Sequence, residues 1–198
     1  MNEANAAGLI DLIRERYAQR LTSEFFRLRG AHSDRIYTEA ALRRSDGELA
    51  TEGESHLGTR VDVVIPSTGQ FVTVDSTSVP SFSPFRLHRG PGEFVIAPVQ
   101  WDWCIITLDC ATGTFSWQPI LDWFHRWFDA DDNKLPDDSG VCGVVHFLSE
   151  PHHSDTRVCI TTDLGSAPSE AFYDLLDACA ESEPLAAHVA NVESTGNA

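Results

Sequence analysis

Residues 101–128 read WDWCIITLDCATGTFSWQPILDWFHRWF and place an apolar segment shortly before an amphipathic one. Residues 101–110 are rich in aromatic and β-branched side chains, which favour a long strand. Residues 118–128 change to helical spacing, with Ile120, Phe124 and Phe128 on one face. Trp123 falls outside that face, so we expect it to be exposed. A strand followed by a helix that packs on it is the core of the predicted fold.

The chain before this stretch shows one helical and several strand-like segments. Residues 4–29 carry apolar side chains three and four positions apart, which predicts an amphipathic helix ending before Gly30. Residues 34–59 are polar, and we expect a mobile loop with a short strand at about 35–41. Period-two patterns and turn residues then predict short strands at 61–65, 71–74, 86–88 and 93–99.

The chain after this stretch is predicted to hold further strands, at 114–117, 141–148 and 157–162. A helix over residues 167–182 follows, with Ser166 as its expected N-cap. The order of elements predicts an α+β fold, a mainly antiparallel sheet of about six to eight strands flanked by an N-terminal and a C-terminal helix. We expect one domain over residues 1–184 and a flexible tail over 185–198.

The cysteines and the apolar runs bear on the compartment. Five cysteines stand at residues 104, 110, 142, 159 and 179, with no C-x-x-C pair. This pattern favours reduced thiols buried as small apolar side chains. The sequence has no run of 18 apolar residues, and its first residues lack the basic and apolar segments of a secretory signal. We therefore expect a cytoplasmic protein.

Negative charge is concentrated in the second half of the chain. Residues 1–100 hold 13 Asp and Glu against 11 Arg, whereas residues 101–198 hold 17 acids against Arg126, Lys134 and Arg157. The halves carry −2 and −14 of the total −16. Such a field repels nucleic acid and anionic lipid and attracts basic partners. Salt adaptation of the whole organism would explain the total charge but explains its segregation poorly.

The sequence offers candidates for a metal site, a thiol nucleophile and a phosphate-binding loop, but each group of residues is better explained as ordinary core, loop or turn. No paired ligand spacing anchors a metal site among its candidates, which are Cys142, His146, His152, His153, Asp155, Cys159 and Asp163. No local motif supports a thiol nucleophile assembled from Cys104 or Cys142, His146, and Asp109 or Asp163. The turn at residues 90–92 lacks a phosphate-loop pattern. We predict no catalytic residue, no metal ligand and no cofactor.

An acidic surface with an aromatic anchor is the remaining functional signal. Acids follow the helix at 118–128 directly and also line the outer face of the helix at 167–182. Aromatic anchors among charges are typical of protein interfaces. The predicted contacts with a partner are Trp123, Asp129, Asp131, Asp132, Asp137, Asp138, Asp174, Asp177 and Glu181. The alternative is that the tryptophans are core and the acids only solvate a loop.

Residues 140–180 resemble the C-terminal part of bacterial immunity proteins, which neutralise polymorphic or secretion-system toxins. The resemblance rests on the strand at 143–146, the D-L-G-S-A-P helix start at 163–168 and the acidic helix after it. It implies a cytoplasmic protein without catalysis that occludes a cognate toxin, often one with a basic active site. The partner would then be a basic toxin or effector protein, with no direct contact to nucleic acid or membrane. The alternatives are a chaperone or adaptor for a secreted effector and a Cys/His-based hydrolase centred on His146.

Overall fold

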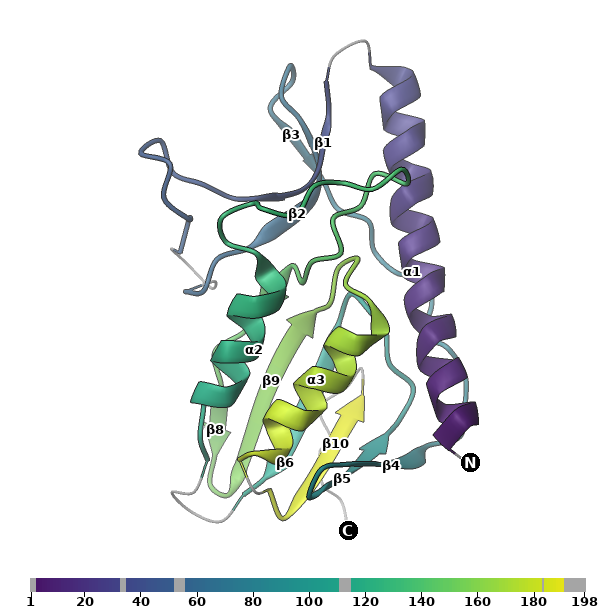
Figure 1. Ribbon diagram of the computed structural model, residues 1–198, viewed down its shortest axis with the longest axis vertical. Helices are drawn as coiled ribbons and strands as arrows, with labels where there is room; N and C mark the ends of the chain where they lie inside the picture. The colour runs from purple at the N-terminus through teal and green to yellow at the C-terminus, as the bar shows by residue number, and fades with distance from the viewer. Residues whose placement is uncertain (1–2, 33–34, 52–55, 111–114, 183, 191–198) are drawn as a thin grey trace.

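The computed structural model describes residues 3–32, 35–51, 56–110, 115–182 and 184–190, and it confirms an α+β architecture (Figure 1). Its elements are α1 (Glu3–Ala31), β1 (Tyr37–Ala41), β2 (Arg60–Ile65), β3 (Gln70–Val72), β4 (Phe85–Arg89), β5 (Gly92–Ile96), β6 (Cys104–Asp109), α2 (Gln118–Phe128), β7 (Phe147–Leu148), β8 (His152–Ser154), β9 (Arg157–Asp163), α3 (Ser169–Ala180) and β10 (Ala186–Ala190). None of the helices in the described part of the chain has the length and hydropathy of a membrane-spanning helix.

The larger sheet has seven strands and carries most of the core. Its order is β4-β5-β10-β6-β9-β7, and β8 also pairs with β9. All neighbouring strands run antiparallel except β10 and β5, which are parallel. The strand predicted at residues 101–110 is β6, and its side chains Cys104–Leu108 are all buried. The sheet is therefore mainly antiparallel, as expected.

The expected flexible tail is wrong for residues 186–190, because they form β10 inside the larger sheet. Ala187 pairs with Phe94 of β5 on one side and with Leu108 of β6 on the other. Ala187 and Val189 are buried at 2% and 0% exposure. This short, alanine-rich segment has little strand propensity of its own. It forms a strand because its backbone hydrogen-bonds to β5 on one side and to β6 on the other. Residues 191–198 lie outside the described residues.

Two helices cover one face of the larger sheet. Figure 1 shows α2 and α3 side by side over β9, β6 and β10, and Trp123 of α2 donates a hydrogen bond to the Ala171 carbonyl of α3 at 2.8 Å. The observed bounds of α2 equal the predicted 118–128. The helix α3 begins at Ser169 after an N-cap at Pro168, so the prediction of Ser166 as the cap is wrong.

A second, smaller core lies between the end of α1 and the three-stranded sheet β1-β2-β3. It is formed by Phe25, Leu28, Ile36, Val63 and Ile65. The short strand predicted at about residues 35–41 is confirmed as β1. The expectation that this part of residues 34–59 lies outside the core, in a mobile loop, is wrong, because Thr38 and Glu39 are buried at 7% and 0% exposure. Residues 33–34 and 52–55 lie outside the described residues.

Two predicted strands are shorter than expected or absent. The strand predicted over 141–148 is reduced to Phe147–Leu148, because the segment before it follows an irregular path between the two sheets. Residues 115–117 form no strand but lead into α2, and residue 114 lies outside the described residues.

Candidate functional site

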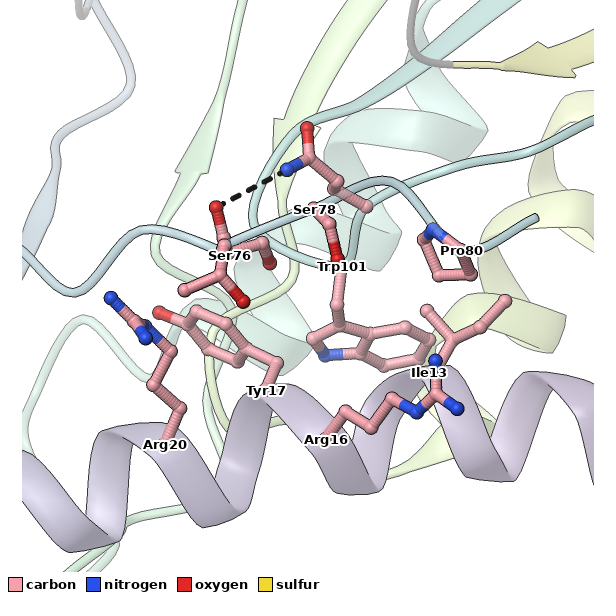
Figure 2. Close-up of a pocket in the computed structure, with 10 residues that line it drawn as sticks. Ile13, Arg16, Tyr17, Arg20, Ser76, Ser78, Pro80 and Trp101 are labelled. Carbon is pink, nitrogen blue, oxygen red and sulfur yellow. Dashed lines mark hydrogen bonds between the residues drawn. The ribbon is translucent and has the colours of Figure 1, made fainter.

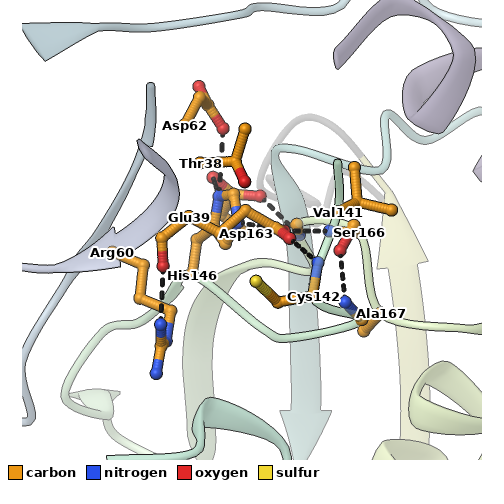
Figure 3. Close-up of polar contacts among 12 residues, drawn as sticks. Thr38, Glu39, Arg60, Asp62, Val141, Cys142, His146, Asp163, Ser166 and Ala167 are labelled. Atoms are coloured by element: carbon orange, nitrogen blue, oxygen red, sulfur yellow. Dashed lines mark hydrogen bonds and ion pairs between the residues drawn. The ribbon is translucent and has the colours of Figure 1, made fainter. Parts of the chain in front are cut away.

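A buried polar cluster lies where the two sheets and α1 meet. Its centre is His146, which is 1% exposed and is surrounded by Glu39 of β1, Asp62 of β2 and Asp163 at the end of β9 (Figure 3). Tyr17 of α1 donates to Asp62 Oδ1 at 2.9 Å. The cluster therefore joins segments that lie far apart in the sequence.

The imidazole is held from both of its nitrogens. Nε2 lies 2.7 Å from Glu39 Oε1, within hydrogen-bonding distance. Nδ1 lies 3.1 Å from Asp62 Oδ1 and 3.6 Å from Asp163 Oδ2, without the alignment of a hydrogen bond to either, so this attraction is electrostatic. Each of the two ring nitrogens of His146 therefore lies next to a carboxylate.

The carboxylates also accept backbone hydrogen bonds. Glu39 accepts from the amides of Cys142 and Ser166, and Asp62 accepts from the amide of Val74 at 2.7 Å. Glu39 has a φ of 50°, a conformation that costs energy in a side-chain-bearing residue and persists only where its surroundings fix it. The network therefore determines the backbone of β1 as well as its side chain.

The cluster shifts the pKa of each of its members. Burial alone would lower the pKa of His146, but Asp163, Asp62 and Glu39 outweigh burial and raise it well above its ordinary value. Burial would raise the pKa of Glu39 and Asp62, but His146 and the backbone donors outweigh it and lower both. Burial and the charge of Asp62 raise the pKa of Asp163. An imidazolium is therefore held against the ionised carboxylates of Glu39 and Asp62.

This arrangement holds the fold together rather than facing a substrate. The side chains of His146 and Glu39 are 1% and 0% exposed, and a general acid or base has to reach the proton that it transfers. Gly165 packs so closely against the imidazole that no larger residue fits. A Cβ at this position would stand 2.4 Å from the Val144 carbonyl oxygen and 2.4 Å from His146 Cδ2. No space for a ligand opens on that side of the imidazole.

The candidate thiol nucleophiles lack a thiolate. Burial raises the pKa of Cys104 to about 12. Burial and then the charge of Glu39 raise the pKa of Cys142 to about 12. Burial also raises the pKa of Cys179. A thiol with such a pKa stays protonated near neutral pH and is a poor nucleophile.

The sequence-derived metal candidates do not come together. Within the described ranges, no group of three or more His, Cys, Asp or Glu side chains has the placement of a metal site. His152 and His153 are exposed on β8, whereas His146 is buried in the cluster between the sheets. Their nearness in the sequence does not bring them to one site.

The predicted acidic segment forms an anchored loop, residues 129–140, which we call the acidic loop. Asp129 accepts from the amides of Asn133 and Lys134, at 3.2 and 2.8 Å. Asp137 accepts from the amide and the hydroxyl of Ser139, at 2.8 and 2.6 Å, and the latter bond lowers its pKa most. These acids shape the loop instead of facing a partner.

Cationic side chains also fix the acidic loop, two of them from outside it and one, Lys134, from within it. Asp132 lies 2.7 Å from an Arg43 nitrogen and 2.8 Å from an Arg60 nitrogen. Arg60 is 5% exposed and also donates to the Phe128 carbonyl at 2.6 Å, near the negative C-terminal end of α2. Lys134 donates to the Gly143 carbonyl at 3.0 Å. Asp132 is therefore already paired.

Other predicted contacts are also engaged or buried. The expectation that Trp123 is exposed is wrong, because it is 1% exposed and lies between α2 and α3. On α3, Asp174 pairs with Arg126 at 3.2 Å and accepts from the Trp127 indole at 3.2 Å, and Asp177 pairs with Arg89. These two acids contribute little free charge.

Asp131, Asp138 and Glu181 remain as exposed acids, and their side chains have no hydrogen-bond or ion-pair partner within the part of the chain that the structure describes. Leu135 stands between the first two in the acidic loop and is 82% exposed. This leucine was not among the contacts predicted from the sequence, although an isolated apolar residue in a charged run is a recognisable signal.

The buried cluster was missed for a different reason. The sequence made His146 and Asp163 candidates for a metal site or a catalytic triad, whereas Asp62 had only its place in the strand predicted at 61–65. Glu39 and Asp62 lie on different strands and carry no local pattern that points to His146. A lone acid between valines in a predicted strand, as at Asp62, is the only local hint.

No model of a protein family, no curated protein and no solved structure matches this chain. The fold and the site therefore rest on the chain's own geometry.

Proposed function

We propose that this protein is a non-catalytic immunity-type inhibitor that binds a basic toxin domain through the acidic loop. The observation that carries the proposal is an exposed leucine, Leu135, held between two unpaired acids on a loop whose other acids and cations are all used to anchor it. The resemblance of residues 140–180 to immunity proteins supports the same class.

Preorganisation explains why such a loop suits binding. A loop that is already ordered loses less conformational entropy on association, so more of the contact energy appears as affinity. Leu135 can enter an apolar depression on the partner, while Asp131 and Asp138 face its basic rim. The net charge of −16 accelerates encounter with a basic partner and makes the rate sensitive to salt.

The test is co-expression with the product of the neighbouring reading frame, using the triple variant Leu135→Ala/Asp131→Asn/Asp138→Asn. We expect the wild type to suppress toxicity and the triple variant to bind at least about 30-fold more weakly and to suppress toxicity poorly, since central anchors contribute about 2 kcal/mol or more. Its urea denaturation should match the wild type, because none of the three side chains anchors the loop.

The matched control is Glu150→Gln/Asp155→Asn, which removes the same charge on either side of β8. This control should bind and protect as the wild type does. If the control and the triple variant lose binding equally, net charge alone acts and the assignment to the acidic loop is wrong. A complex in which the partner keeps its full activity would instead identify a chaperone or adaptor.

A further inference from the structure

A small cavity lies on another side of the molecule, between α1 and the segment that follows β3 (Figure 2). Its volume is about 60 Å³, enough for a few water molecules or one small oxyanion. Arg16 and Arg20 line it from α1, Thr77 and Ser78 line it from the segment, and Trp101 lines it from the loop before β6. Every one of these side chains brings a hydrogen-bond donor.

The indole of Trp101 supplies a donor that the protein itself leaves unsatisfied. Trp101 is 3% exposed, and its Nε1 has no hydrogen-bond acceptor in the described part of the chain. Figure 2 shows the indole between Tyr17 and Ile13, with its nitrogen-bearing edge toward α1. Because nearly all buried indole N–H groups find an acceptor, this donor points to a ligand that accepts.

The two arginines supply positive charge that no ion pair in the described part of the chain neutralises, although Glu24 attracts Arg20 at longer range. Arg16 and Arg20 are one helical turn apart and exposed, and neither has an ion-pair partner among the described residues. In contrast, Arg14 and Arg27 of the same helix pair with glutamates. Figure 2 shows the Arg16 and Arg20 side chains on either side of the indole. Both arginines line the same cavity as the indole, and Tyr17 is drawn between the indole and Arg20.

Two carboxylates near this cavity are already hydrogen-bonded to residues that line it, Asp62 to Tyr17 and Asp102 to Ser76. Asp102 accepts from the amide of Ser76 at 2.5 Å and also from its hydroxyl. Ser76 therefore faces Asp102, which leaves the hydroxyls of Thr77 and Ser78 and the two guanidinium groups for a ligand. The donor set favours an anion with oxygens in several directions.

We propose that this cavity binds a phosphate group, either free phosphate or the phosphate of a small metabolite, through Trp101 Nε1, Arg16 and Arg20. Donors reach the cavity from the helix, the segment and the indole, which suits a tetrahedral oxyanion better than a planar carboxylate. The site is independent of the acidic loop, so either proposal can fail without the other.

The test is a titration of the ¹⁵N-labelled protein with inorganic phosphate at constant ionic strength. We expect the indole N–H resonance that is absent from the Trp101→Phe variant to shift and saturate. Trp101→Phe keeps an aromatic ring of smaller size but removes the donor, and Arg16→Gln/Arg20→Gln removes the charge. Each should weaken phosphate binding about tenfold or more, since a hydrogen bond to a charged group is stronger than a neutral one.

The matched control is Arg27→Gln/Arg29→Gln, which removes the same charge from the same helix and should leave phosphate affinity within about twofold of the wild type. The proposal is overturned if phosphate leaves the Trp101 resonance unchanged, or if both arginine pairs weaken binding equally. Acetate binding as tightly as phosphate overturns the tetrahedral assignment. Tighter binding of glycerol 3-phosphate or a nucleoside monophosphate supports a metabolite, and equal or weaker binding supports free phosphate.

Discussion

The carboxylates of the buried cluster and those of the acidic loop are the same chemical groups in opposite settings. In the cluster, Glu39 and Asp62 are nearly inaccessible and are held by an imidazolium and by backbone amides. In the acidic loop, Asp137 and Asp138 stand in water, and only the first of them is bonded. Buried and compensated carboxylates therefore stabilise the fold of this chain, whereas exposed and unpaired carboxylates are available to bind a partner.

The largest expected effect comes from removing the cation of the cluster. His146→Ala leaves three carboxylates facing one another without compensation, so we expect the free energy of unfolding to fall by about 3–5 kcal/mol. Urea denaturation at pH 7 measures it. Arg126→Ala, which breaks the exposed pair with Asp174, is the control and should cost less than about 1 kcal/mol.

A similar loss in both variants would contradict the distinction between buried and exposed acids. If His146→Ala proves too unstable to purify, His146→Gln replaces it. The glutamine keeps a hydrogen-bond donor toward Glu39, so its loss of unfolding free energy should lie between those of His146→Ala and Arg126→Ala.

The second expected effect is on the pH dependence of stability. The raised pKa of His146 gives a contribution that is complete below about pH 6.5 and is lost as the pH rises through the folded value. The lowered pKa values of Glu39 and Asp62 give a contribution that is complete above about pH 4.5 and is lost as the pH falls through the folded values. The raised pKa of Asp163 opposes this acid loss.

Urea midpoints from pH 3 to pH 10 measure this dependence. We expect stability to decline on both sides of neutrality in the wild type, and the alkaline decline to shrink in His146→Gln. Burial and the nearby aspartates raise the pKa of Tyr17, so its contribution is lost only above about pH 10, its ordinary value, and the decline measured up to pH 10 reports mainly on His146. An unchanged alkaline limb in His146→Gln would show that the imidazole is not charged in the folded protein.

The smallest expected effect separates two neighbouring acids of the loop. Asp137→Ala removes the acceptor of two hydrogen bonds from Ser139 and a longer one from Val141, so we expect the free energy of unfolding to fall by about 1 kcal/mol. Asp138→Ala removes an acid without a partner among the described residues and should change stability by less than about 0.5 kcal/mol. Equal losses would mean that the loop is not anchored as the structure indicates.

The spacing of apolar residues predicted the helices α1 and α2, because an amphipathic helix depends on residues only three or four positions apart. The apolar spacing of residues 118–128 predicted α2 with its observed bounds, and the spacing of residues 4–29 predicted α1 to within two residues at each end. Within α2, however, the assignment of Trp123 to the exposed face was wrong. The face of a helix that is covered on two sides, here by the sheet and by α3, is wider than a single apolar stripe.

The sequence by itself determined the α+β class, the main helices and strands, and the segregation of charge into the second half. These depend on interactions over a few residues or on composition. Only the tertiary structure decided that residues 186–190 fill the gap between β5 and β6, and that Glu39 meets His146 across 107 positions. It also decided which acids of the loop are bonded and which stay available. The reason is physical: a strand partner, a buried ion pair or an anchoring amide is a contact between segments, and its energy depends on distances that the order of residues does not contain.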